Sequence, residues 1–110
     1  MENKIVYSAI FIKKAKIYKK KYHSLVEELY ELESKLLENP AQGNDLGSGL
    51  FKIRLAIKSK GKGKSGGFRI ITYLVSTSID GIVINMLTLY DKSEESSIDK
   101  KELQKIINAL

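Results

Sequence analysis

The sequence contains no cysteine, one histidine and one proline among its 110 residues. Without cysteine, disulfide bonds, cysteine-ligated zinc and thiol catalysis are excluded. The single histidine, His23, cannot form a cluster of the kind that holds a transition metal, and no nucleophile-elbow pattern accompanies it. We expect His23 to be an exposed linker residue. A chain of this length with 43% hydrophobic residues is expected to form one domain over residues 1–110, with no metal and no cofactor.

The sequence also lacks a long apolar run. No stretch approaches the roughly 20 residues that a helix needs to cross a bilayer. The first residues, MENKIVYSAIFIKK, include an early glutamate and lack a long apolar segment followed by a small-residue cleavage site. They therefore do not have the pattern of a signal peptide. Together these absences predict a small cytoplasmic protein with no membrane partner.

Acidic residues are absent between Asp45 and Asp80, although the whole chain has 13 of them against 19 Lys and Arg. The positive charges of that acid-free segment are Lys52, Arg54, Lys58, Lys60, Lys62, Lys64 and Arg69. Part of this block lies on predicted strands, whose side chains alternate between two faces. It therefore indicates a surface that binds a polyanion, most often nucleic acid. A second basic block at 13–21 is expected to be a solvated helix face.

Two amphipathic helices are predicted in the first 40 residues, after a short strand at 3–7. Apolar residues in each recur at spacings of four, three and four, as on one helix face. These residues are Phe11, Ala15, Tyr18 and Tyr22, and then Leu25, Leu29, Leu32 and Leu36. Ser24 and Glu27 have the spacing of a capping box that would start the second helix, and Pro40 would end it. The short connection between them predicts an antiparallel helical hairpin.

After this hairpin the pattern changes to that of strands. Residues 41–49 are rich in Gly, Asn, Asp and Ser and predict a loop. In 51–58 apolar and mostly cationic residues alternate, so a strand there would bury one face and present Lys52 and Arg54 on the other. This strand has the clearest functional geometry in the sequence.

Two further strands and a helix are predicted in the remainder of the chain. The strands cover 68–75 and 82–90, and Asp80-Gly81 is expected to form the turn between them. Residues 99–110 carry apolar residues at helical spacing and predict a terminal helix. The expected fold is α+β with the order β-α-α-β-β-β-α, in which an antiparallel sheet packs against the helical hairpin.

Residues 58–67, KSKGKGKSGG, are expected to form a flexible basic loop. Gly63-Lys64-Ser65 matches the end of a phosphate-binding loop, but the leading glycine of that motif would fall on Lys58, and a strand follows instead of a helix. The loop lysines are nevertheless candidates for contacts to an RNA backbone: Lys58, Lys60, Lys62 and Lys64. The alternative is a disordered hairpin loop. Tyr73 and Tyr90 are candidates for stacking on bases.

Two stretches, FKIRLAIKSKGKGKSGGFRIITYLV and LTLYDKSEESSIDKKELQKII, strongly resemble the RelE/ParE superfamily, and its HigB-type branch most closely. The shared features are a K-[IV]-R strand, a G-K-G-K-S-G-G loop, an aromatic-Arg strand and a Y-x-K-S-E segment. The resemblance implies a compact RelE-like α+β domain. It also implies a toxin of a type II toxin–antitoxin module that cleaves mRNA on the ribosome and so inhibits translation. Its partners would be the ribosome, mRNA and a cognate antitoxin, usually a DNA-binding protein.

Carried over by position, the resemblance implies four catalytic candidates: Lys52, Arg54, Arg69 and Lys92. RNA can be cut without a metal when its own 2′-OH attacks the adjacent phosphorus. Arg54 and Arg69 can hold phosphate oxygens and remain charged, so Arg69 is expected to be a phosphate ligand and not a core residue. Lys52 can act as the base or Lys92 as the acid, because a lysine among like charges releases its proton more readily. The identity of the general base stays open.

Two other functions remain possible from the sequence. The superfamily also contains toxins that inhibit gyrase, and a degenerate member would be a non-catalytic RNA-binding domain. Two arginines aligned with phosphate-binding strands favour RNA cleavage, since a purely electrostatic binder would not need those particular positions.

Overall fold

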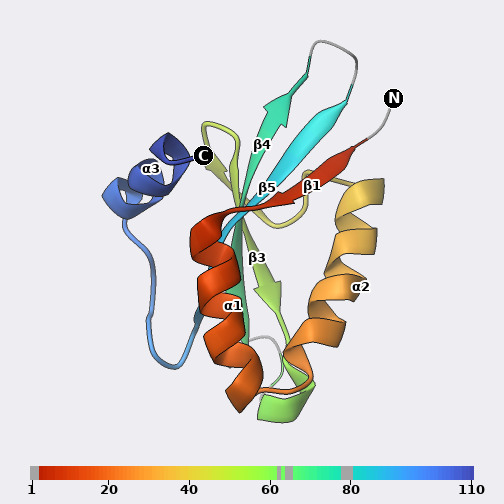
Figure 1. The fold of residues 1–110 in the computed structure, drawn as a ribbon, viewed down its shortest axis with the longest axis vertical. Helices are drawn as coiled ribbons and strands as arrows, with labels where there is room; N and C mark the ends of the chain where they lie inside the picture. Colours follow the sequence, from red (N-terminus) through yellow and green to blue (C-terminus); the bar gives the residue numbers. More distant parts are fainter. Residues whose placement is uncertain (1–2, 62, 64–65, 78–80) are drawn as a thin grey trace.

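The computed structural model describes residues 3–61, 63, 66–77 and 81–110, and has an α+β fold, as expected (Figure 1). Its elements are β1 (Lys4–Tyr7), α1 (Ala9–Lys21), α2 (Leu25–Glu38), β2 (Asn44–Gly47), β3 (Leu50–Leu55), the short 3₁₀ helix η1 (Lys58–Lys60), β4 (Phe68–Ser76), β5 (Ile82–Asp91) and α3 (Lys100–Asn108). The strands form one sheet in the order β1-β5-β4-β3-β2. None of the helices in the described ranges is long and apolar enough to cross a membrane.

The sheet is mixed, which corrects the expectation of an antiparallel one. The pairs β2–β3, β3–β4 and β4–β5 are antiparallel, but β1 runs parallel to β5. The helical hairpin carries the chain away after β1, so this strand need not pair with its neighbour in sequence. Its partner, β5, is the strand most distant from it in the chain. The predicted turn residue Asp80 lies outside the described residues.

Part of the segment predicted as a loop at 41–49 is a strand. β2 pairs with the start of β3 and forms a hairpin with it. The tight turn is made by Gly47, Ser48 and Gly49, which all have positive φ values of 89°, 54° and 83°. The glycine-rich composition therefore marks the turn of a hairpin, since glycine adopts this backbone region without strain.

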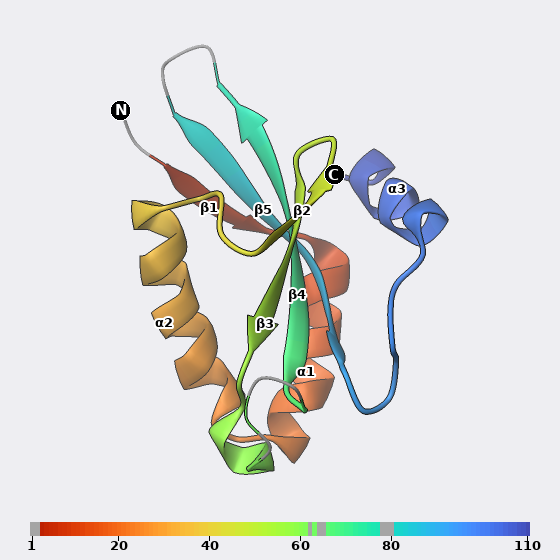
Figure 2. The ribbon, with the colours of Figure 1, turned by 180° about the vertical axis from the view of Figure 1, so that it is seen from behind.

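The sheet carries a set of buried apolar side chains on each face. The hairpin-side core consists of Phe11, Leu25, Leu29, Leu32, Leu36, Ile53, Ile57, Phe68, Ile70, Ile84, Met86 and Leu89. The α3-side core consists of Ile71, Leu87, Tyr90, Leu103 and Ile106. Ile70 and Ile71 belong to different cores because successive strand residues point to opposite faces. Both views of the ribbon show α3 lying apart from the α1–α2 hairpin (Figures 1 and 2).

The helical hairpin forms as predicted, but its second helix starts differently. Ser8 caps α1 by accepting a hydrogen bond from the backbone N–H of Phe11 at 3.0 Å. Ser24 does not form the predicted capping box, because its side chain bonds no backbone N–H of the first turn of α2. Its hydroxyl instead donates to Glu28 at 3.0 Å and lies 2.8 Å from the hydroxyl of Ser59. His23 is exposed, as expected.

The first residues of the predicted basic loop are a fixed 3₁₀ helix. The backbone N–H of Lys58 donates to the Glu28 carboxylate at 2.7 Å, and that of Ser59 donates to the Ser24 hydroxyl at 3.0 Å. The expectation of a flexible loop is therefore wrong for residues 58–60, which are held against the start of α2. Lys62 and Lys64 lie outside the described residues.

Candidate functional site

Cationic side chains from two strands meet on the sheet face that also carries the α3-side core. Arg54 of β3 pairs with Arg69 of β4, which in turn pairs with Tyr90 of β5. In the adjacent row, Lys52 pairs with Ile71 and, on its other side, with Asn44 of β2. Directly paired Cα atoms of antiparallel strands are about 4.5–5.5 Å apart, and the two rows are roughly 7 Å apart. We call Lys52, Arg54 and Arg69 the cationic patch.

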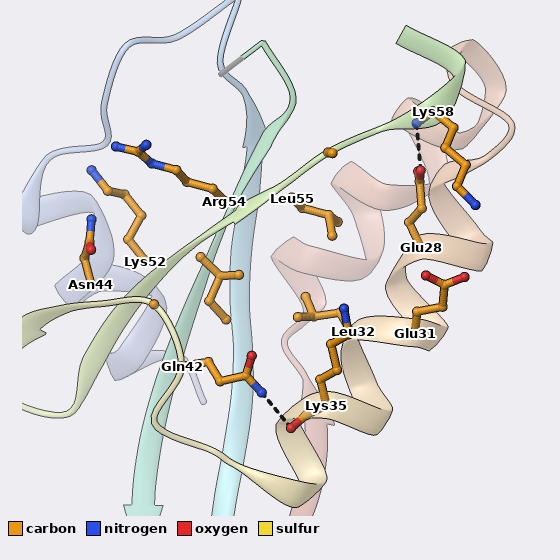
Figure 3. Close-up of a pocket in the computed structure, with 13 residues that line it drawn as sticks. Glu28, Glu31, Leu32, Lys35, Gln42, Asn44, Lys52, Arg54, Leu55 and Lys58 are labelled. Atoms are coloured by element: carbon orange, nitrogen blue, oxygen red, sulfur yellow. Dashed lines mark hydrogen bonds between the residues drawn. The ribbon is translucent and has the colours of Figure 1, made fainter. Parts of the chain in front are cut away.

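The outer part of this patch is open and uncompensated. Figure 3 shows Asn44, Lys52 and Arg54 extending to one side of β3, while Leu55 extends toward α2. Arg54 is exposed and Lys52 is half-buried, and neither side chain makes a hydrogen bond or ion pair in the structure as described. Like charges directly opposite each other on a sheet are destabilising. The arrangement therefore favours an anion that would lie across β3 and β4.

Arg69 lies in the packed layer, which corrects the expectation that it is not a core residue. Only 5% of the residue is exposed, and its guanidinium donates to the carbonyl oxygen of Phe68 at 3.3 Å. Burial raises the pKa of the neighbouring Tyr90 hydroxyl, and the positive charge of Arg69 partly opposes that shift. Arg69 thus contributes its charge from beneath the surface of the patch, while Arg54 is presented to solvent.

Lys92 lies at the end of the same sheet, just beyond β5. Its backbone N–H donates to the carbonyl oxygen of Gly67 at 3.0 Å, and its ammonium donates to the carbonyl oxygen of Ser96 at 2.9 Å. The structure therefore places Lys92 two residues beyond Tyr90, the strand partner of Arg69. The Lys92 ammonium is engaged by its own turn and is not joined to the cationic patch by a hydrogen bond among the described residues.

Gly67 brings the end of the basic loop close to β3. A Cβ atom built on Gly67 would lie 2.1 Å from the carbonyl oxygen of Leu55, a distance that no real side chain tolerates. Only glycine permits this approach, and the approach places the Gly67 carbonyl where Lys92 can donate to it. The second glycine of the Gly-Gly pair before β4 is thus the residue in the sequence that indicates the close approach of the loop end to β3 and Lys92.

Of the loop lysines, Lys60 is not available to RNA. Its ammonium forms an ion pair with Asp91, and the two side chains are 4% and 1% exposed. The prediction that Lys60 contacts an RNA backbone is therefore wrong for this structure. Lys58 is exposed and remains a candidate contact, while Lys62 and Lys64 lie outside the described residues.

The two tyrosines predicted to stack on bases differ in exposure. Tyr90 is only 1% exposed and packs in the α3-side core, so its ring is not presented to a base. That expectation is corrected because α3, which the strand pattern did not position, covers the ring. Tyr73 is half-buried against the edge of the same core and remains a candidate.

Two hollows adjoin the cationic patch, and Lys52 lines both. A groove of about 590 Å³ runs between α2 and β3, with Glu31, Lys35 and Arg54 also among its lining residues (Figure 3). A smaller cavity of about 270 Å³ lies beneath α3, where Leu50, Tyr90 and Leu103 contribute to its walls. In the described ranges, no three His, Cys, Asp or Glu side chains come together in a way that could hold a metal ion.

Asn44 is the site residue that the sequence did not reveal. It is exposed, pairs with Lys52 and points to the same side of β3 (Figure 3). Its amide can donate to and accept from a nucleotide. The composition of residues 41–49 predicted a loop, and only the pairing of β2 with β3 places Asn44 beside the patch.

Comparison with protein-family models places the chain in a known family. The family described as the RelE toxin of the RelE/RelB toxin–antitoxin system matches residues 3–109. The match covers every helix and strand of the fold, including the strands that carry the cationic patch.

Proposed function

The chain belongs to the RelE family of toxins, and from this premise we propose that it is a ribosome-dependent endoribonuclease that cleaves mRNA and so inhibits translation. The observation that carries the proposal is the cross-strand pair Arg54–Arg69 with Lys52 in the adjacent row. A cationic patch of this kind, in which Lys52 and Arg54 make no hydrogen bond or ion pair among the described residues, complements the charge that builds up on a phosphate during cleavage. The G-K-G-K-S-G-G loop supports a place in the HigB-type branch of the family.

The proposed reaction is attack of the RNA 2′-OH on the adjacent phosphorus. The 2′-oxygen–phosphorus bond forms and the bond to the leaving 5′-oxygen breaks, which leaves a 2′,3′-cyclic phosphate and a free 5′-OH. Arg54 contacts the non-bridging phosphate oxygens from the surface, and Arg69 adds positive charge from below. Their guanidinium groups stay charged at any physiological pH, which suits stabilisation of the phosphorane.

Proton transfer is assigned to the two lysines of the site. Lys52 is the proposed base for the 2′-OH, because it projects from the same face of β3 as Arg54 (Figure 3). Lys92 is the proposed acid for the leaving 5′-oxygen, and its ammonium would have to leave the Ser96 carbonyl to reach it. Proton transfer of this kind typically contributes 10²–10⁴-fold to a rate.

Dependence on the ribosome is proposed because the patch is an open sheet surface. Arg54 is exposed, and the adjoining groove is lined by charges of both signs, including Glu31 and Lys35. Such a surface attracts an RNA chain but offers little to align the 2′-OH with the scissile phosphorus. A ribosome that holds mRNA in a defined conformation would supply that alignment.

Primer extension on cellular mRNA after brief expression of the toxin tests this proposal. We expect discrete new 5′ ends within translated codons for the wild-type chain and none for Arg54→Ala at equal protein level. Lys20→Ala, an exposed lysine of α1, is the matched control and is expected to cleave like the wild type. Intact mRNA together with impaired DNA supercoiling would instead identify gyrase as the target. Intact mRNA and DNA with retained RNA binding would indicate a non-catalytic domain.

The family implies a cognate antitoxin, and we propose that it neutralises the toxin mainly by covering the cationic patch with acidic side chains. A second route is steric, through the outer surface of the helical hairpin. There Val26 and Tyr30 are 42% and 64% exposed and line an apolar hollow of about 340 Å³ between α1 and α2. The antitoxin is proposed to carry a DNA-binding domain.

A further inference from the structure

A buried ion pair joins the basic loop to the end of β5. The ammonium of Lys60, in η1, contacts the carboxylate of Asp91, and both side chains are almost completely excluded from solvent. The same ammonium donates to the Ser93 hydroxyl at 3.0 Å and lies 5.2 Å and 5.6 Å from the ring centroids of Tyr22 and Phe68. Lys60 is thus enclosed by aromatic rings and by one carboxylate.

The Asp91 carboxylate is saturated with hydrogen bonds from three segments. Tyr22, at the end of α1, donates to one carboxylate oxygen at 3.2 Å. The other oxygen accepts from the backbone N–H of Ser93 at 3.0 Å and from its hydroxyl at 2.7 Å, in addition to Lys60. Burial alone would raise the pKa of Asp91, but the bonds from Lys60 and Ser93 outweigh it and lower the pKa to about 2. Asp91 is therefore ionised at neutral pH.

Stability alone does not account for a pair of this kind. Removing two charges from water is costly, and apolar residues of similar volume often stabilise a protein as well or better. What the pair does provide is a fixed connection between η1, the end of α1 and the end of β5. Such a connection matters where segments that carry functional groups must be held in one arrangement.

The segments that the pair joins are the ones that border the cationic patch. Asp91 stands between Tyr90, the strand partner of Arg69, and the proposed acid Lys92. Lys60 stands at the start of the basic loop, whose other end, Gly67, accepts the hydrogen bond from the Lys92 backbone. The pair therefore lies where the loop, the Lys92 turn and β5 meet.

We propose that Lys60 and Asp91 form a positioning pair that holds η1 and Lys92 in register with Arg54 and Arg69. Neither residue touches the RNA. The pair sets the geometry of the groups that contact the RNA, and the positive charge of Lys60 is neutralised by Asp91 inside the protein. This role rests on the proposed function, because its consequence is measured as RNA cleavage.

The test separates positioning from stability with one neutral double variant. In Lys60→Met, Asp91 is left buried without its cation, and in Asp91→Asn, Lys60 is left buried without its anion. Each single variant is expected to unfold at a lower urea concentration than the wild type. Lys60→Met/Asp91→Asn removes both charges and keeps a carbonyl oxygen for the Ser93 N–H. The urea midpoint of this double variant is expected to return most of the way from the values of the single variants to that of the wild type. Lys20→Met on α1 is the matched control.

Cleavage of mRNA on purified ribosomes is then measured for the stable double variant. We expect kcat to fall by about 10²-fold with KM changed less than threefold, because reacting groups displaced by about 1 Å lose roughly that factor. Hydrogen exchange supplies a readout that does not depend on activity. The backbone N–H groups of Ser59 and Lys92, which are bonded in the wild type, are expected to exchange at least tenfold faster in the double variant.

Three results would overturn the inference. A double variant with wild-type kcat and unchanged exchange at Ser59 and Lys92 would show that the pair does not position the site. A double variant whose KM rises while its kcat stays at the wild-type value would show that Lys60 or Asp91 contributes to RNA binding. A wild-type chain that cleaves no mRNA would overturn both this inference and the proposed function, whereas the first two results leave the proposed function standing.

Discussion

The two faces of the sheet are built from the same strands but differ in how much of each is buried. The face toward the hairpin is closed, and its Phe68, Ile70 and Met86 are fully buried. The other face is divided, because α3 covers its apolar part while Arg54 stays open to solvent. Successive residues of one strand thus belong to a sealed core and to a charged surface. Alternation along the strand allows a small domain to combine a core with a reactive surface.

The largest expected effect is on the closed face. Phe68→Ala should lower the free energy of unfolding by about 3–5 kcal/mol, because it leaves a cavity in a close-packed core. The ring of Phe68 contacts those of Tyr18 and Tyr22, with centroids 4.6 Å and 5.7 Å away. Arg54→Ala, one row away on the other face, should change stability by less than about 0.5 kcal/mol. Urea unfolding of both variants would contradict the comparison if their losses were equal.

The open face should dominate binding of the antitoxin. Lys52→Glu/Arg54→Glu is expected to weaken antitoxin affinity by 10²-fold or more at low salt, and by clearly less at high salt, because exposed charges are screened. Val26→Glu/Tyr30→Glu changes the outer surface of the hairpin and should have a smaller effect that depends less on salt. Calorimetric titration of each variant with the antitoxin at two salt concentrations measures both affinities and so distinguishes the two routes. A loss confined to the hairpin variant would show that inhibition is steric.

Acid should weaken the connection that Asp91 makes between η1, the end of α1 and the end of β5. The pKa of Asp91 is about 2 in the folded protein, against an ordinary value of 3.8. The resulting stabilisation is fully present above pH 4 and is lost as the pH falls from about 4 to about 2, with a magnitude of about 2 kcal/mol. Asp91→Asn should therefore be less stable at pH 7 and lack this part of the acid dependence. Parallel pH profiles for the two proteins would contradict the assignment.

The smallest effect is expected at the rim of the open face. The Lys58 side chain is exposed, and the hydrogen bonds of this residue are made by its backbone: its N–H donates to Glu28, and its carbonyl oxygen accepts from the Gly61 N–H. Lys58→Ala should reduce RNA cleavage less than about fivefold, with a loss that disappears as salt is raised. Its unfolding free energy should stay within about 0.5 kcal/mol of the wild type. A large loss that persists at high salt would place Lys58 inside the site and not at its rim.

Local patterns in the sequence account for most of the fold. Apolar spacing predicted both helices of the hairpin, the terminal helix and the strands β3, β4 and β5. Apolar spacing could not predict the parallel pairing of β1 with β5, because local periodicity does not determine which distant strands pair or in what register. The hairpin formed by β2 was hidden for a similar reason, since its residues resemble those of a loop.

The candidate site was predicted in part. Alternation placed Lys52 and Arg54 on one face, and the structure confirms that arrangement. It could not show that Arg69 is buried, nor that Lys60 finds Asp91, a partner 31 residues away. Burial and long-range pairing depend on how the helices and strands pack together. The sequence alone therefore does not distinguish a charged residue that is buried from one that is exposed.

Cleavage of a ribosome-bound mRNA that carries one 2′-deoxynucleotide at the scissile position decides whether the toxin cuts RNA through its 2′-OH. We expect the wild-type toxin to cleave the all-RNA substrate and to leave the substituted position intact. We also expect Arg54→Ala, with its urea midpoint unchanged, to cleave the all-RNA substrate 10²–10³-fold more slowly. Cleavage at the 2′-deoxy position, or a wild-type rate for Arg54→Ala, would show that the open face of this sheet does not cut RNA through its 2′-OH.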